Sequence, residues 1–334
     1  MIAANAVLVF LWLGVTTYAV LAGADFGGGV WDLLAGGAQR GLEQRRRIAA
    51  SIGPVWEANH VWLIFALVVL WTGFPTVFAA LASTLYIPLT VVAFGVIARG
   101  AAFAFRQASP QPAMKRAYGA LFAVASLVTP FFLGMVAGAI ASGRVPAGIA
   151  RGDVIRSWTG PTSLVGGALA VGGCAFVSAV FLIADARRDG QAELVAAFRR
   201  RALAGGLAVA LLTAVAAVVI RGDAPRLAAG LGGRALPVVI LSAALSTVTL
   251  VLIWQRHFAM VRVGAALSVL SILWAWAAAQ YPALLVGSVT VAEGAAPHAT
   301  LVALLVTLSV GSLVLLPALG ALFWLIRRPA TAEV

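Results

Sequence analysis

The sequence is poor in charge, in histidine and above all in cysteine. Only 10% of the 334 residues are charged, three are histidine, and Cys174 is the one cysteine. A single thiol cannot form a disulfide within the chain or a cluster of thiolate metal ligands. No polar stretch is long enough to enclose a hydrophobic core of its own, so we expect no separate water-soluble domain.

Long apolar runs are what the sequence has in abundance. Apolar residues make up 62% of the chain, and the mean hydropathy is +1.03. Runs of about twenty apolar residues can cross a bilayer as helices, so the sequence predicts an all-α polytopic membrane protein with residues 1–334 in a single integral membrane domain. We predict nine spans, at about residues 6–35, 54–75, 77–105, 117–142, 159–184, 203–220, 235–254, 263–280 and 299–326. The first span is too long for a signal-peptide core and follows no Lys or Arg, so we expect it to be retained.

Proline and glycine mark the expected breaks and contacts. Pro54 is expected to open the second span, and the segment "TGFPT" to form the turn before the third. Two GxxxG pairs indicate ordinary close packing of helices, and prolines inside spans predict kinks. These pairs are Gly23/Gly27 and Gly134/Gly138, and the prolines are Pro88, Pro130 and Pro317.

Positive charge is distributed unevenly between the two ends of the predicted spans. The loops after the first, third, fifth and seventh spans, with the C-terminus, hold 17 of the 23 Lys and Arg when Arg99 near the end of the third span is included. The loops after the fourth and sixth spans hold three each. Positive loops favour the cytoplasm, so we predict the N-terminus outside and the C-terminus inside. The spread over short loops also argues against a nucleic-acid-binding patch.

Two carboxylates interrupt the first apolar run, in the segment "GADFGGGVWDLL". Asp25 and Asp32 are seven residues apart, so they share one face of a helix about two turns apart. An ionisable group within the membrane is costly unless it is paired or hydrated, which makes it a functional candidate. Asp32 is nearer the interface, where it could face water or the arginines of "EQRRR", and we expect it to be structural.

The next two spans bring further polar side chains to the same level of the membrane. The segment "SIGPVWEANHVWLIF" places Glu57, Asn59 and His60 in the first two turns of the second span. Arg99 and Arg106, also seven residues apart, share a face at the cytoplasmic end of the third. Short loops between the three spans favour proximity of these groups.

The acids and arginines allow two interpretations. We predict that Asp25, Glu57 and Arg99 form a proton pathway. The residues expected to support it are Trp56, Asn59, His60 and Arg106. The alternative is that the two acids form salt bridges to Arg99 and Arg106 that only fasten the helices together.

Ligands for haem or a metal ion are scarce in this sequence. His60 could ligate a metal or haem, but it has no His, Cys or Met partner at helical spacing. His257 and His298 lie at opposite membrane faces in the predicted topology, and the four methionines complete no site. We therefore expect this chain alone to bind no cofactor and no metal.

Several segments, in order along the whole chain, resemble subunit II of cytochrome bd-type quinol oxidases. The segment "GADFGGGVWDLL" is similar to the G-x-D-x-G-x-G signature of that subunit's first helix, and "SIGPVWEANHVWLIF" to its second-helix motif of a Trp, an acid and a polar residue. The segments "RGAAFAFR", "LVTPFFLGMVAG" and "QYPALL" with "TVAEGAAPHATL" resemble its third helix, fourth helix and last outer loop. The likeness is particularly to the short, cyanide-insensitive branch of the family.

The resemblance implies a complex of the bacterial cytoplasmic (inner) membrane that oxidises quinol, reduces dioxygen to water and builds a proton gradient. It implies two four-helix bundles plus one helix for this chain, with haem b and haem d held by subunit I. Asp25 and Glu57 match acids of the family's proton route, whereas Ala104 stands where relatives commonly carry an acid. Arg99, Arg106 or a loop acid such as Glu43 would then shape proton entry, or subunit I would supply the acid. A small third subunit, quinone and lipid are further expected partners.

Two other functions compete with this one. A stand-alone secondary transporter could use Asp25, Glu57 and His60 for proton coupling, and two repeated halves with helices broken at the midplane would mark it. The spacing along the sequence shows neither feature. The chain could also be a scaffold for subunit I, and only substitution of the buried acids separates that function from a proton pathway.

Overall fold

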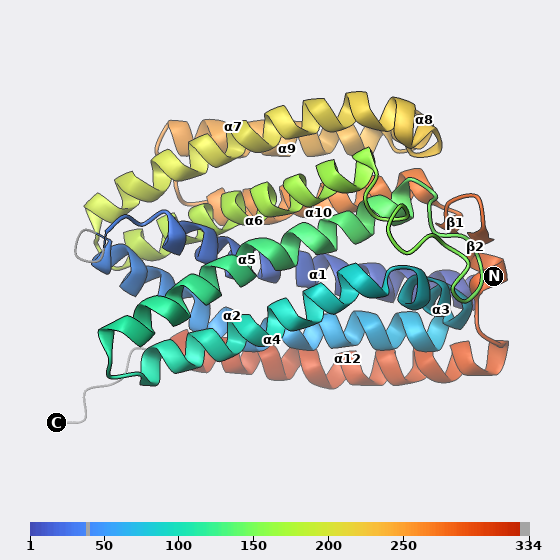
Figure 1. Cartoon of the computed structure of the whole chain (residues 1–334), viewed down its shortest axis with the longest axis horizontal. Helices are drawn as coiled ribbons and strands as arrows, with labels where there is room; N and C mark the ends of the chain where they lie inside the picture. The colour runs from blue at the N-terminus through green and yellow to red at the C-terminus, as the bar shows by residue number, and fades with distance from the viewer. Residues whose placement is uncertain (38–40, 328–334) are drawn as a thin grey trace.

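The computed structural model describes residues 1–37 and 41–327, apart from the side chains at 54–58, 316, 319 and 322–327. Long helices run side by side along one axis, with most connections at the two ends of the molecule (Figure 1). The long helices are α1 (Ile2–Leu33), α2 (Leu42–Gly73), α4 (Tyr86–Ala108), α5 (Pro112–Ala141), α6 (Pro161–Arg188), α7 (Ala192–Asp223), α9 (Leu236–Trp254), α10 (Val261–Gln280) and α12 (His298–Arg327). The short helices α3 (Pro75–Thr84) and α8 (Pro225–Gly232) follow α2 and α7.

Membrane-spanning character is confirmed by the helices themselves. Among the described residues, eight helices are long and apolar enough to cross a membrane. The C-terminal part of α2 with α3 gives a ninth candidate, which is bent by 118°. The prediction of an all-α polytopic membrane protein with about nine spans is therefore correct.

Several predicted boundaries are wrong. α2 begins at Leu42, so Pro54 lies inside this helix and does not open it, and α7 begins at Ala192 instead of near residue 203. The third predicted span is two helices, α3 and α4, which meet at Leu85. Pro88 lies in the first turn of α4, where its missing N–H removes no helical hydrogen bond and requires no kink. Hydropathy marks only the part of a helix inside the hydrocarbon, whereas backbone hydrogen bonding continues through the charged first turns of α2 and α7.

The two halves of the chain repeat one another, which the sequence did not reveal. Three helices of the second half each begin 150 residues after a helix of the first half. α7 begins at Ala192 and α2 at Leu42, α8 begins at Pro225 and α3 at Pro75, and α9 begins at Leu236 and α4 at Tyr86. α2 and α7 both have 32 residues. Their C-caps match as well, with φ and ψ of −137° and 61° at Phe74 and −138° and 59° at Ala224. The repeat lies in the backbone, whose geometry many different apolar side chains can support, so no fixed period is visible in the sequence.

Small residues set the distance between α6 and its neighbours. A Cβ atom at Gly27 of α1 would overlap the carbonyl oxygen of Cys174 on α6. The same close approach joins α5 to α6, where Gly134 meets Gly166 and Gly138 meets Ser163. Both GxxxG pairs therefore pack helices of this chain together, which confirms the predicted role.

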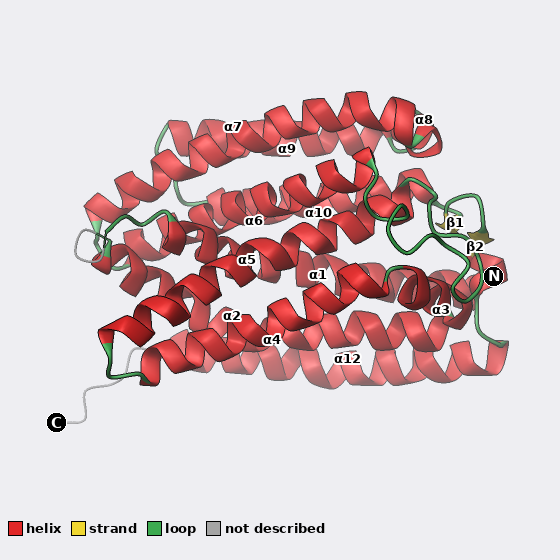
Figure 2. Ribbon diagram, viewed as in Figure 1, coloured by secondary structure: helices red, strands yellow, loops and turns green. Residues whose placement is uncertain are grey.

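The segment between α10 and α12 forms a small cap at the end of the bundle where the N-terminus lies (Figure 2). It contains β1 (Ala283–Leu285), paired antiparallel with β2 (Val289–Thr290), and the one-turn helix α11 (Val291–Gly294). A capping box begins α11, in which the Thr290 N–H donates to the Glu293 carboxylate at 2.8 Å. The Ala296 N–H donates to the carbonyl oxygen of Gly73 at 2.9 Å and ties the cap to α2.

Candidate functional site

An ion pair between α1 and α4 lies in the interior of the helix bundle. Arg99 donates from Nη1 to Asp25 Oδ2 at 2.8 Å and from Nη2 to Asp25 Oδ1 at 2.7 Å, so the pair is bidentate. Nη2 also donates to the backbone carbonyl of Asp25 at 2.9 Å. The exposed fraction is 1% for Asp25 and 2% for Arg99. The salt bridge that the sequence offered as an alternative to a proton pathway is therefore present for Asp25.

The rest of the Arg99 guanidinium group is also enclosed. Nε donates to Ser126 Oγ on α5 at 2.9 Å, and Ser126 donates in turn to the carbonyl oxygen of Phe122 at 2.7 Å. The guanidinium carbon is 5.0 Å from the ring centroid of Phe26 and 4.7 Å from that of Phe122, within the range of cation–π attraction. Loss of one partner from such a pair leaves an uncompensated buried charge, which costs about 3–5 kcal/mol.

Glycines on α1 and α4 bring these helices close to α5 around the ion pair. A Cβ atom at Gly29 would overlap the side chain of Ser126, and one at Gly95 would overlap Thr129 Oγ1. The glycines that follow Asp25 in "GADFGGG" thus allow α5 to place Ser126 against the arginine.

Asn59 on α2 is the second polar neighbour of Asp25. Its Nδ2 atom lies 3.5 Å from Asp25 Oδ2, at the long limit of a hydrogen bond, and the residue is 1% exposed. Asn59 Oδ1 and the Tyr18 hydroxyl are buried and have no hydrogen-bond partner in the described part of the chain. The first three predicted spans, which correspond to α1, α2 and α4, therefore contribute Asp25, Asn59 and Arg99 to one polar cluster, as the sequence predicted.

Three of the predicted pathway residues are placed less completely. His60 follows Asn59 on α2 and is half-buried. Trp56 and Glu57 also lie within α2, but their side chains lie outside the described residues. The part of these two side chains in the site stays a prediction from the sequence.

A second acid–arginine pair lies two turns further along both helices. Arg106 Nη1 donates to Asp32 Oδ2 at 3.0 Å, and Arg45 Nε is 3.8 Å from Asp32 Oδ1. Of the two surroundings considered for Asp32, water or the arginines of "EQRRR", the structure shows a contact with the arginine Arg45. Arg106 therefore pairs with Asp32 and not with Asp25, because the equal seven-residue spacings keep the two helices in register.

Sequence reasoning missed Ser126 and a third ion pair. Ser126 lies in the apolar segment "FAVASLVTP", where nothing marks it as a partner of Arg99. Arg262 Nη2 on α10 lies 2.5 Å from Asp185 Oδ1 on α6, and Arg188 Nη2 lies 3.6 Å from the same oxygen. Asp185 belongs to the charged segment "ADARR" near the end of α6, and no sequence motif marks Arg262 as its partner.

The candidate metal ligands of the described residues are scattered. The described residues contain no group of three or more His, Cys, Asp or Glu side chains that could hold a metal ion. His257 follows α9 and His298 begins α12, and these two points lie at opposite ends of the bundle (Figure 1). Two axial histidine ligands for one haem cannot come from these positions.

Comparison with known proteins decides the family. The family model for cytochrome bd terminal oxidase subunit II matches residues 3–326. The chain belongs to that family. Cytochrome bd ubiquinol oxidase subunit 2 of Bacillus subtilis (strain 168) is 34% identical over 116 residues, 35% of this chain and 33% of the relative. Cytochrome bd-I ubiquinol oxidase subunit 2 of Escherichia coli (strain K12) is 30% identical over 142 residues, 41% of this chain and 37% of the relative. The aligned part thus spans about a third of the length of these curated relatives.

A solved bd oxidase structure extends the likeness over nearly the whole chain. The bd oxidase from Geobacillus thermodenitrificans contains a chain that superposes with a TM-score of 0.77 and 25% sequence identity. The superposition covers 98% of this chain and 99% of that one. The family identified from the helix motifs is therefore confirmed.

Proposed function

We propose that this chain is subunit II of a membrane complex that oxidises quinol and reduces dioxygen to water. The observation that carries the proposal is the match to the subunit II family at residues 3–326. The similar curated proteins are named ubiquinol oxidase subunits, and the similar solved structure is a bd oxidase. In this proposal the chain works as one integral membrane domain and is inactive in isolation.

The haems and the site of quinol oxidation belong to the partner, subunit I, in this proposal. The separation of His257 and His298 supports that division, because these two histidines cannot both ligate one haem. A small third subunit, quinone and lipid are further candidate partners. The complex lies in the bacterial cytoplasmic membrane with the N-terminus outside and the C-terminus inside, and the concentration of Lys and Arg at one end of the spans supports this orientation.

The contribution of this chain to the reaction is a route for protons from the cytoplasm. Reduction of dioxygen to water consumes protons within the membrane, where hydrocarbon conducts none and ionisable side chains provide relays. We assign the route to Asp25, Glu57 and Arg99. The supporting residues are Trp56, Asn59, His60 and Arg106. Proton uptake from the cytoplasm, with release of quinol protons on the other side, builds a proton gradient without a pump.

Asp25 can exchange a proton at one of its two oxygens without leaving its place. Oδ2 faces both Arg99 Nη1, at 2.8 Å, and Asn59 Nδ2, at 3.5 Å. A proton that arrives on Oδ2 displaces the bond from Nη1, while the bond from Nη2 to Oδ1 still holds the carboxyl group. Arg99 then stabilises the carboxylate that remains when the proton moves on.

The stand-alone transporter is the second candidate, since the chain does have two repeated halves. The breaks between α2 and α3 and between α7 and α8 lie near one end of the bundle and not at its middle (Figure 1). Helices broken at the midplane are the feature that a transporter site of this kind needs. The quinol oxidase subunit is therefore the function that the observations favour.

Purification and oxygen consumption test the proposal. The chain, tagged and extracted in a mild detergent, should copurify with a larger haem-bearing chain, and the complex should consume oxygen when supplied with quinol. A chain that purifies without any partner and moves a substrate across liposome membranes would contradict the proposal and support the transporter.

A further inference from the structure

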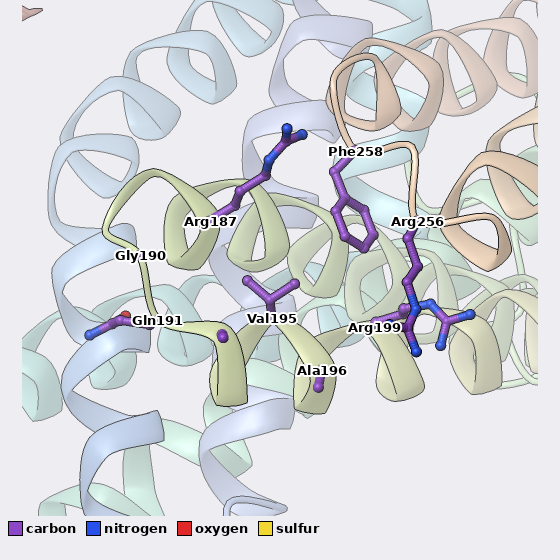
Figure 3. Close-up of a pocket in the computed structure, with 9 residues that line it drawn as sticks. Arg187, Gly190, Gln191, Val195, Ala196, Arg199, Arg256 and Phe258 are labelled. Carbon is purple, nitrogen blue, oxygen red and sulfur yellow. The ribbon is translucent and has the colours of Figure 1, made fainter.

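A pocket of about 390 Å³ lies at one end of the second half of the chain, away from the Asp25–Arg99 pair. It is formed by the end of α6, the start of α7 and the turn between α9 and α10 (Figure 3). The lining combines three arginines with apolar side chains: Arg187, Arg199, Arg256, Val195, Ala196 and Phe258. The site is therefore both strongly basic and partly apolar.

The positive charge of this pocket is not neutralised by the described part of the chain. None of the described lining residues is an acid. Arg199 donates only to backbone, from Nε to the carbonyl oxygen of Ile253 at 2.8 Å and from Nη2 to that of Trp254 at 2.5 Å. Arg187 and Arg256 are exposed and form no ion pair with any described residue.

Two of the acids nearest in sequence are engaged elsewhere, since Asp185 is paired with Arg262 and Asp189 forms an ion pair with Arg47 of α2. A third, Glu193, lines a different pocket together with Glu43 and Arg200. An anion from outside the chain is thus the partner that the three free positive charges can accept.

The pocket lies at the level where the membrane meets water. Four candidate spans end around it, since α6 ends at Arg188, α7 begins at Ala192, α9 ends at Trp254 and α10 begins at Val261. Trp254 is 67% exposed, and an exposed tryptophan at the end of a span is typical of the lipid headgroup layer. A ligand in the pocket can therefore have a charged part in the headgroup layer and an apolar part in the hydrocarbon.

The backbone gives a separate reason to regard Arg256 as specific to this site. Its φ of 62° is in the left-handed region, and its N–H donates to the carbonyl oxygen of Ile253 at 3.2 Å where α9 ends. Glycine is the usual residue at such a helix end. The turn at position 256 does not require an arginine, whereas the Arg256 side chain lines the pocket.

We propose that the pocket binds the phosphate of an anionic phospholipid headgroup. Arg187 and Arg256 bind the phosphate through their guanidinium donors, and Phe258 and Val195 contact the apolar part of the lipid next to the headgroup. Guanidinium groups match phosphate oxygens in geometry as well as charge, and basic pockets between helices at the cytoplasmic side are suited to acidic headgroups. The inference does not rest on the proposed proton route.

Native mass spectrometry of the purified complex tests this site. The probes are phosphatidylglycerol and phosphatidylcholine with the same acyl chains, added in detergent. The complex should bind phosphatidylglycerol more tightly than phosphatidylcholine. Loss of two arginine charges in Arg187→Gln with Arg256→Gln should weaken phosphatidylglycerol binding about tenfold or more. Lys115→Gln with Arg116→Gln is the matched control, because it removes the same charge from exposed positions near the start of α5 and should leave the affinity unchanged.

A single substitution tests the same site in a variant that is expected to fold normally. Arg256→Gly suits the left-handed backbone and removes one charge, so it should assemble normally and weaken phosphatidylglycerol binding about fivefold. The proposal is wrong if the complex does not discriminate between the two lipids, or if the pocket and control variants lose affinity equally. Displacement of bound phosphatidylglycerol by an equal concentration of inorganic phosphate would reveal a site for soluble anions and would also overturn it.

Discussion

At the scale of single residues, the buried acid and its arginine act as one unit. Asp25→Asn keeps the shape of the side chain but leaves the Arg99 guanidinium buried without a counterion. We expect it to destabilise the protein by about 3–5 kcal/mol, measured as thermal unfolding of the detergent-purified complex. Asp32→Asn is the matched control, since its partner Arg106 is 27% exposed, and it should cost about 1 kcal/mol or less.

The double variant Asp25→Asn with Arg99→Gln distinguishes a paired charge from general damage to packing. Removal of both charges should recover much of the stability that Asp25→Asn loses, because the uncompensated guanidinium is then absent. A double variant that is less stable than the single one would show that the two side chains contribute independently.

Glu57 tests the proton pathway apart from the ion pair. Glu57→Gln keeps the shape and most hydrogen-bonding capacity but removes the titrating proton. We expect this variant to assemble with its partner and retain the haem spectrum, yet to lose most quinol-driven oxygen consumption, while Glu57→Asp retains part of it. Normal respiration with full haem content would favour the scaffold, and failure to assemble would make the residue structural.

At the scale of elements, the contact between α1 and α6 leaves no room for a side chain at Gly27. Gly27→Ala should destabilise the protein by about 1–3 kcal/mol, because the new methyl group overlaps the backbone of α6 and the helices must separate. Gly173→Ala on α6 is the control, because an added Cβ atom there would meet nothing within 4 Å, and it should be neutral or slightly stabilising. Thermal unfolding compares the two, and equal effects would contradict the packing argument.

The stability of the small cap between α10 and α12 is expected to depend on pH. Hydrogen bonds from the Thr290 backbone and hydroxyl hold the pKa of Glu293 below its usual value. The folded cap is therefore favoured above the ordinary glutamate pKa, and this contribution disappears as the pH falls through the lowered value. Protection of the Thr290 amide against hydrogen exchange, taken relative to its intrinsic rate at each pH, should fall only in acid, and Glu293→Gln should remove that dependence. An acid-induced loss of protection that persists in Glu293→Gln would exclude this carboxylate as its cause.

At the scale of the whole molecule, the sequence predicted those features of the fold and the site that depend on hydropathy and on residue spacing within one helix. Hydropathy predicted the membrane helices, and the seven-residue spacings in α1 and α4 predicted which acids and arginines share a face. Ser126 was not predictable, because its role depends on where α5 packs. The starts of α2 and α7 and the repeat of 150 residues were missed for a related reason, since they are properties of backbone geometry and different side chains satisfy them.

Haem content tests the division of labour within the complex. This chain, expressed without its partner, should show no haem absorption, because His257 and His298 cannot both ligate one haem and His60 has no His, Cys or Met partner at helical spacing. The measurement is the visible spectrum of the purified chain after reduction, with the copurified complex as the positive control. A stoichiometric haem in the isolated chain would overturn the assignment of all haems to subunit I.

The two partners of the buried ion pair are translated at different times. Asp25 and Arg99 are 74 residues apart, and α1 is made first. At the usual rates of translation, roughly 4–15 s pass between the two residues. During that interval the carboxylate of α1 has no arginine to meet, so the nascent helix must wait with Asp25 protonated or in contact with water at the insertion machinery. Once α4 arrives, Arg99 can pair with Asp25, and α1 no longer needs a protonated or hydrated carboxyl group within the bilayer.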